Sequence, residues 1–95
     1  MQMRLFVSFN VKAESIDVFL QVMQQAKTEL AKVPGCQAVE LIQSADNASR
    51  IILSEVWESK AIHYQYAAQM AEAESMDGLS PLLNGAPETS EFYFR

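Results

Sequence analysis

The chain has 95 residues and a mass of 10.6 kDa, which is the size of one domain with one hydrophobic core. Seven basic and twelve acidic side chains give a formal net charge of −5, which disfavours the concentrated basic surface that nucleic acids require. One cysteine and one histidine are too few for a zinc cage, and no apolar run approaches the roughly 20 residues of a membrane helix. We therefore expect a single domain over residues 1–95, located in the cytoplasm, with neither nucleic acid nor a membrane as partner.

The first third of the chain predicts a strand followed by a helix. Apolar residues recur at every second position over residues 3–11, which is the period of a β-strand. From Ser15 the period becomes that of an amphipathic helix, which Pro34 and Gly35 end. The apolar stripe of this helix consists of Ile16, Phe19, Leu20, Met23, Leu30 and Val33.

The remaining chain predicts three strands and a second helical region. Residues 36–43 and 50–58 form a hairpin around a polar turn at residues 44–48. Ser59 caps a helix that begins at Lys60 and continues through Met70. A further helical stretch covers residues 72–83, where Gly78 and Pro81 weaken it, and a last strand covers residues 89–94.

The predicted order β-α-β-β-α-β is that of an α+β, ferredoxin-like fold, with one antiparallel sheet and helices on one face. The strand at residues 50–58 is apolar on both sides, since Ile51, Leu53 and Trp57 face one way and Ile52 and Val56 the other. So small a chain has no further element to cover the second face. We therefore expect two protomers to pack sheet against sheet in a homodimer.

Three residues near the end of this strand are candidates for chemistry. Trp57 ends the strand, where a large aromatic side chain serves either the core or a binding site. His63 and Tyr66 lie one helical turn apart and share a face with Met70, so they can form one wall of a cavity opposite the sheet. A histidine can act as acid or base near neutral pH. The alternative is that His63 and Tyr66 only occupy a partly solvated helix face.

Two acidic residues and the cysteine are weaker candidates. Glu40 and Glu55 lie on adjacent predicted strands, and two carboxylates turned inward would raise one pKa. The interpretation that we favour places both outside a site, paired with Arg4 or Arg50 or solvated at the rim of a dimer. Cys36 is expected to behave as a small apolar residue.

Several short motifs occur along the chain: the Val11-Lys12 pair, the Phe19-Leu20 pair, Pro34-Gly35-Cys36, Arg50 after a polar turn, the run from Glu55 to Lys60, and the run from Pro81 to Pro87. Together they resemble the antibiotic biosynthesis monooxygenase family of dimeric α+β-barrel proteins. The likeness covers nearly the whole chain, from the first predicted strand to the last.

The resemblance implies a ferredoxin-like protomer, a barrel formed by the two sheets of a dimer, and a pocket between sheet and helices in each subunit. Similar proteins include cofactor-free oxygenases of quinols or polyketide-derived aromatic compounds, isomerases and degraders of small signalling sugars, and haem degraders. Where family members commonly carry a helical histidine, this sequence has Tyr66, and a second histidine is replaced within residues 69–72. Haem degraders carry an asparagine at about the position of Val7, so haem is disfavoured.

On these grounds we expect an oxidoreductase, a cofactor-independent monooxygenase that acts with molecular oxygen, and without a metal, on a small aromatic, quinol or polyketide-like molecule. In this hypothesis Trp57 forms the apolar wall, Tyr66 donates a hydrogen bond to a developing oxyanion and His63 is the base. The expected substrate contacts are Val7, Phe9, Leu53 and Met70. The alternatives are a non-catalytic module that binds a small metabolite, and an isomerase or degrader of a small signalling sugar.

Overall fold

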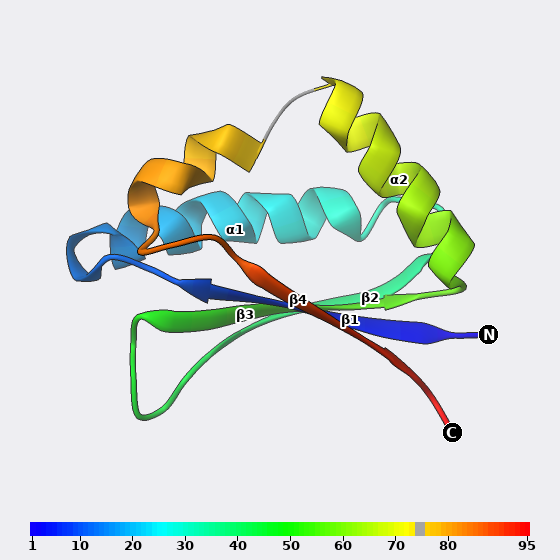
Figure 1. The fold of residues 1–95 in the computed structure, drawn as a ribbon, viewed down its shortest axis with the longest axis horizontal. Coiled ribbons are helices and arrows are strands. Elements are labelled where there is room, and N and C mark those ends of the chain that lie inside the picture. The colour runs from blue at the N-terminus through cyan, green and yellow to red at the C-terminus, as the bar shows by residue number, and fades with distance from the viewer. Residues whose placement is uncertain (74–75) are drawn as a thin grey trace.

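The computed structural model describes the backbone of residues 1–73 and 76–95, and the side chains of residues 1–69 and 79–95. A four-stranded sheet carries the helices on one of its faces (Figure 1). The strand order is β2-β3-β1-β4, and every neighbouring pair is antiparallel. The strands are β1 (Met3–Asn10), β2 (Cys36–Gln43), β3 (Arg50–Trp57) and β4 (Glu88–Tyr93).

Two α-helices and two short 3₁₀ helices connect these strands, so the predicted ferredoxin-like order is confirmed. They are η1 (Ala13–Ser15), α1 (Ile16–Leu30), α2 (Lys60–Ala73) and η2 (Met76–Leu82). As predicted, Ser59 caps α2, since its Oγ accepts a hydrogen bond from the backbone N–H of Ile62 at 3.2 Å. Within the described residues, neither helix is both long and apolar enough to cross a membrane.

Several element ends differ from the prediction, the last two strands by one residue each, since they span Arg50–Trp57 and Glu88–Tyr93. The first strand ends at Asn10, because Val11 leaves the sheet ladder and forms an isolated bridge with Leu83. Helix α1 ends at Leu30, and the following turns are closed by tighter bonds such as Val33 N–H to the Leu30 carbonyl at 3.0 Å. The stretch predicted as helix over residues 72–83 contains the end of α2 and then η2, while residues 74–75 lie outside the described part.

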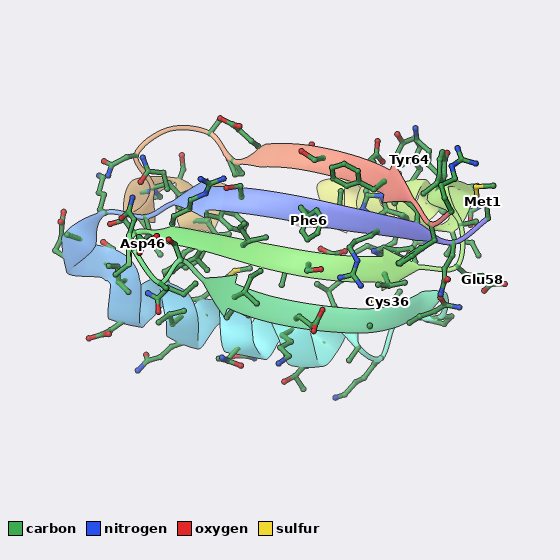
Figure 2. The ribbon with its side chains drawn as sticks, turned by 90° about the horizontal axis from the view of Figure 1, so that it is seen from below. Met1, Phe6, Cys36, Asp46, Glu58 and Tyr64 are labelled. Atoms are coloured by element: carbon green, nitrogen blue, oxygen red, sulfur yellow. The ribbon has the colours of Figure 1, made fainter. Side chains whose placement is uncertain are left out.

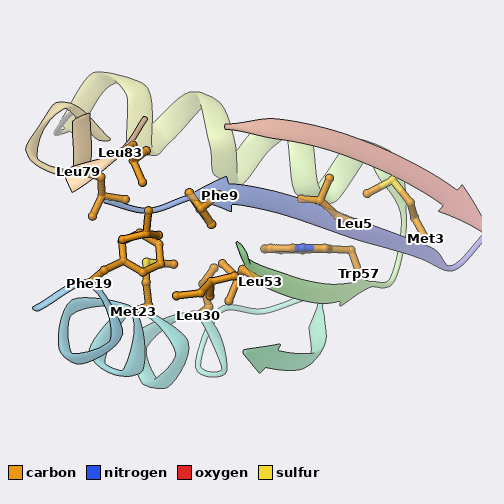
Figure 3. Packing of buried hydrophobic residues seen from close by; sticks show 12 residues of the cluster. Met3, Leu5, Phe9, Phe19, Met23, Leu30, Leu53, Trp57, Leu79 and Leu83 are labelled. Carbon is orange, nitrogen blue, oxygen red and sulfur yellow. The ribbon is translucent and has the colours of Figure 1, made fainter. Parts of the chain in front are cut away.

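The hydrophobic core lies between the helices and the sheet (Figure 3). The predicted stripe of α1 supplies Phe19, Met23 and Leu30, which are buried. The aromatic ring of Phe19 packs edge-on against Phe9 of β1, with 5.0 Å between ring centroids. At the other end of the sheet Trp57 is buried completely. The core therefore runs along the length of β1 and β3.

The face of the sheet away from the helices, which we call the open face, is partly apolar (Figure 2). Ile52 and Val56 of β3 lie on it, as predicted, because their neighbours in the strand point under the helices. Phe92 of β4 is 54% exposed there and packs edge-on against Phe6 at 5.7 Å. The guanidinium of Arg4 lies over the Phe6 ring at 5.9 Å. Large apolar side chains thus remain exposed beside a central arginine.

Gly35 joins the end of α1 to β2 in a backbone conformation that side chains disfavour. Its φ is +93°, and a Cβ atom built there would collide with Ile62 of α2. Gly85 has a similar φ of +105°, but its Cβ would have open space around it. Gly35 therefore permits the close approach of α2 to the start of β2.

Replacing each glycine by alanine separates backbone strain from this contact. We expect Gly85→Ala to lower the free energy of unfolding by about 1 kcal/mol, the cost of a left-handed backbone. Gly35→Ala adds an overpacking cost of about 1–3 kcal/mol, which an Ile62→Ala background removes. Urea denaturation of wild type, Gly85→Ala, Gly35→Ala, Ile62→Ala and the Gly35→Ala/Ile62→Ala double variant measures these values. Equal losses for the two alanine variants would contradict the close packing of Gly35 on α2.

Candidate functional site

Four side chains gather where β3 ends and α2 begins, and we call Glu55, Trp57, His63 and Tyr66 the Trp57 cluster. The indole of Trp57 lies 5.2 Å from the His63 ring and 5.4 Å from the Tyr66 ring, measured between centroids. The chain passes directly from Trp57 to the cap of α2, so the first turns of the helix lie above the indole. The structure thus brings together the three residues predicted for catalysis.

Glu55 is the cluster member that the sequence interpretation placed wrongly. Its side chain is only 5% exposed, and its Oε1 accepts a hydrogen bond from Trp57 Nε1 at 2.7 Å. It lies on the helix-covered face because β3 alternates and Glu55 shares the parity of Trp57. The expectation that Glu55 pairs with an arginine or is solvated is therefore wrong. Its spacing of two residues from Trp57 is the signal in the sequence, because it places Glu55 on whichever face of β3 buries Trp57.

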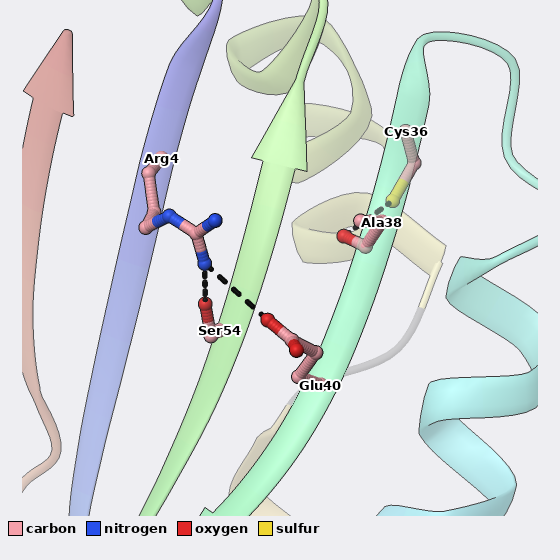
Figure 4. Close-up of polar contacts among 5 residues, drawn as sticks. All are labelled: Arg4, Cys36, Ala38, Glu40 and Ser54. Carbon is pink, nitrogen blue, oxygen red and sulfur yellow. Dashed lines mark hydrogen bonds and ion pairs between the residues drawn. The ribbon is translucent and has the colours of Figure 1, made fainter. Parts of the chain in front are cut away.

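Glu40 behaves as expected and lies on the open face (Figure 4). Its Oε1 is 3.4 Å from Nη1 of Arg4, which also donates a hydrogen bond to Ser54 Oγ at 2.7 Å. The two glutamates are therefore on opposite sides of the sheet. The favoured interpretation was right for Glu40 because an arginine of β1 lies within reach across β3.

Burial governs the protonation of the cluster. It raises the pKa of the Glu55 carboxyl, and the hydrogen bond from Trp57 offsets part of this effect. The pKa of Tyr66 is raised by burial and by the charge of Glu55. Its phenol therefore stays protonated and can donate a hydrogen bond. Burial lowers the pKa of His63, which favours the neutral imidazole. Its Nδ1 is buried and has no hydrogen-bond partner among the described residues.

Cys36 lies beside the cluster at the start of β2, opposite Trp57 in the ladder. Its side chain is half-buried, and its thiol contacts the Ala38 carbonyl at 3.8 Å. Burial and the charge of Glu55 both raise the pKa of the thiol. Because the thiolate is the nucleophilic form, Cys36 is a poor nucleophile here, in keeping with the expectation of an apolar role.

The residues predicted to contact substrate lie at different places. Val7 and Leu53 face each other across β1 and β3 on the helix-covered side, next to the pair that contains Glu55. Phe9 packs on Phe19 instead, and it lies about 20 Å along the strand from the partner of Trp57, given about 3.3 Å per residue. The structure therefore does not bring Phe9 next to the Trp57 cluster. The side chain of Met70 lies outside the described residues.

Two surface hollows of the described part lie away from this cluster, near the start of β3. The smaller, of about 250 Å³, is lined by Ile42, Gln43, Ser44, Arg50 and Ile52. The larger, of about 410 Å³, is lined by Ser8, Phe9, Asn10, Asn47, Arg50, Asn84, Ala86 and Glu88. Both are open to solvent. Among the described residues, no group of three or more His, Cys, Asp and Glu side chains could hold a metal ion.

Residues 3–75 match the family model described as antibiotic biosynthesis monooxygenase. None of the curated proteins matches the chain. Among solved structures, a conserved protein from Methanosarcina mazei Go1 superposes with a TM-score of 0.89 at 20% identity, over 100% of this chain and 94% of that one.

Two other solved structures have the same fold. SnoaB, a cofactor-independent oxygenase from Streptomyces nogalater, is similar in a mutant form, with a TM-score of 0.84 and 19% identity over 99% of this chain and 93% of that chain. A conserved protein of unknown function from Bacteroides thetaiotaomicron also gives a TM-score of 0.84, with 16% identity over 98% and 97% of the two chains. Identities this low establish the likeness of fold.

The buried position of Glu55 predicts how stability depends on pH. Because folding raises its pKa, the folded chain binds the proton more tightly than the unfolded chain, and stability falls as pH rises through the folded pKa. Glu55→Gln, which can still accept the Trp57 bond, is expected to be more stable than wild type at pH 7, with the difference shrinking below the ordinary glutamate pKa. Chemical denaturation across this pH range measures the effect. Glu58→Gln, at an exposed position, is the control, and equal pH profiles for wild type and Glu55→Gln would contradict the prediction.

Proposed function

This chain belongs to the antibiotic biosynthesis monooxygenase family, and we propose that it is a cofactor-independent oxygenase of small aromatic, quinol or polyketide-like molecules. The observation that carries the proposal is the Trp57 cluster, where one indole is flanked by an imidazole and a phenol from α2. A flat apolar ring with two polar groups beside it suits a planar aromatic substrate that carries oxygen atoms.

The reaction needs little from the protein if the substrate itself supplies electrons to oxygen. For an anthrone, one molecule of dioxygen converts the ring methylene to a carbonyl, and one molecule of water is released. The site then has to remove a proton and stabilise the oxyanion that forms. In this proposal His63 is a base, because burial favours its neutral form, and Tyr66 donates to the oxyanion, because its phenol keeps its proton.

Apolar residues of the sheet complete the proposed site. Val7 and Leu53 lie on the helix-covered face beside the cluster and would form its floor, while Phe9 would contact only the far end of a longer substrate. The Trp57 ring has no exposed surface, so a substrate that stacks on it must displace His63 or Tyr66. Both of these side chains are half-buried, which leaves them reachable from solvent along α2.

We also propose that the open face binds a second copy of the chain. Exposed apolar side chains of β2 and β4, such as Ile42 and Phe92, lie there beside the half-buried Ile52. Covering them with an identical face would remove apolar surface from water, and a small single core gains most from such burial. The dimer would leave the helix-covered face, and with it the Trp57 cluster, on the outside of each protomer.

Oxidation of dithranol, a dihydroxyanthrone, tests the proposed activity. We expect oxygen uptake and anthraquinone formation above the uncatalysed rate. Tyr66→Phe should lower kcat by about 10²-fold, because it removes a hydrogen bond that stabilises the oxyanion. Tyr64→Phe is the matched control, since Tyr64 is exposed on the same helix and outside the cluster.

A panel of anthrones and quinols that gives no uptake above background would contradict the oxygenase proposal. If dithranol or its anthraquinone then raises the melting temperature without turnover, the chain acts as a binding module instead. In that case Tyr66→Phe would change the affinity for the ligand alone.

Analytical sedimentation of two variants tests the dimer. One carries a substitution on the open face and the other a substitution on the helix side. Wild type is expected to sediment as a dimer, and Phe92→Asp should raise the dissociation constant at least about 10-fold by placing a charge in the interface. Val18→Asp is the control, because Val18 is 52% exposed on α1, on the helix side. A monomeric wild type, or equal weakening by both variants, would contradict an interface on the open face.

A further inference from the structure

Glu55 is a buried acid whose presence the fold does not explain. Among the described residues, Glu55 is the one charged residue that is buried, and it forms no ion pair with any of them. Burying an unpaired carboxylate costs free energy. The single hydrogen bond from Trp57 could be accepted equally well by the amide oxygen of glutamine, which carries no charge. A structural role alone therefore does not account for an acid at this position.

A hydrogen bond from Trp57 holds the carboxylate of Glu55 in a defined orientation within the Trp57 cluster. Trp57 Nε1 binds Oε1 at 2.7 Å, and Oε2 forms no hydrogen bond with described residues. The same indole contacts the rings of His63 and Tyr66. The protein thus holds one carboxylate oxygen of Glu55 and gives the other no hydrogen-bond donor among the described residues.

We propose that Glu55, in place of His63, is the group that accepts a carbon-bound proton from an aryl ketone substrate, with Trp57 as the residue that positions it. This inference rests on the proposed oxygenase function and concerns the step in which the substrate loses its proton. The C–H bond breaks, and the proton forms an O–H bond with Glu55. The electron pair is delocalised onto the ketone oxygen, to which Tyr66 donates a hydrogen bond.

Burial acts in opposite directions on the two bases of the cluster. It raises the pKa of Glu55, which makes the carboxylate a stronger base, and it lowers the pKa of His63, which makes the imidazole a weaker one. The other titratable groups facing this region are Cys36 of β2 and Tyr66 of α2, with Glu29 of α1 and Glu91 of β4 behind them. Lys60 at the start of α2 is paired with Glu91 at 3.6 Å. Burial therefore favours proton acceptance by Glu55 and disfavours it at His63.

Deuterium exchange into the ring methylene of dithranol in D₂O, followed by NMR under nitrogen, measures proton removal without oxygen chemistry. We expect wild type to accelerate exchange and Glu55→Gln to lose about 10²-fold or more of that rate. Glu58→Gln, an exposed substitution on the same strand end, should exchange as wild type does. Near-ultraviolet circular dichroism verifies that each variant keeps its folded core.

The two proposals fail in different ways. Wild-type exchange with no oxygen uptake in air would contradict the oxygenase function and, if Glu55→Gln abolishes exchange, would support Glu55 as the proton acceptor. Oxygen uptake without anaerobic exchange would support the oxygenase and overturn the role of Glu55. Full exchange by folded Glu55→Gln would also overturn it.

Trp57→Phe provides a test that does not depend on how well Glu55→Gln folds. The exchange rate of wild type should fall as pH drops through the Glu55 pKa, which lies above the ordinary glutamate value. Phenylalanine removes the N–H donor that lowers this pKa, so the fall should begin at a higher pH in Trp57→Phe. If the exchange rate of Trp57→Phe begins to fall at the same pH as that of wild type, the proposal that Trp57 positions a catalytic Glu55 is overturned.

Discussion

The hydrogen bond between the Trp57 indole and the Glu55 carboxylate is the interaction on which the candidate site depends. A buried indole N–H needs an acceptor, and the nearest one on the same face of β3 is the side chain two residues earlier. This bond orients the indole, and the orientation decides how His63 and Tyr66 pack on it from α2. The two residues of the strand thus determine where the groups of the helix lie.

Alternation along β3 divides the sheet into a helix-covered face, which carries the Trp57 cluster, and the open face. Odd-numbered residues from Ile51 to Trp57 lie beneath the helices, whereas Ile52, Ser54 and Val56 lie on the open face. On the open face Arg4 satisfies Ser54 and Glu40, so the polar groups there are paired and the neighbouring apolar side chains remain available to a partner. Beneath the helices the carboxylate of Glu55 has only the indole as its hydrogen-bond partner among the described residues. Its charge is therefore compensated less than that of Glu40.

The family establishes the framework, while this chain differs in the groups that line it. Tyr66 occupies the place where the sequence comparison leads one to expect a helical histidine, and His63 lies one turn earlier on the same face. A phenol with a raised pKa donates a hydrogen bond but does not readily accept a proton. In the proposed reaction the proton would therefore be accepted by His63 or Glu55, and burial weakens the first and strengthens the second as a base.

Periodicity in the sequence was sufficient to determine the order of elements, the buried stripe of α1 and the cap at Ser59. These features depend on neighbours in the chain, whose spacing is visible in the sequence. The burial of Glu55 and the distance of Phe9 from Trp57 were decided only by the tertiary structure. Both faces of β3 are apolar, so the pattern could not say which one the helices cover, and only the pairing of β1 with β3 places Phe9 at the other end of the core.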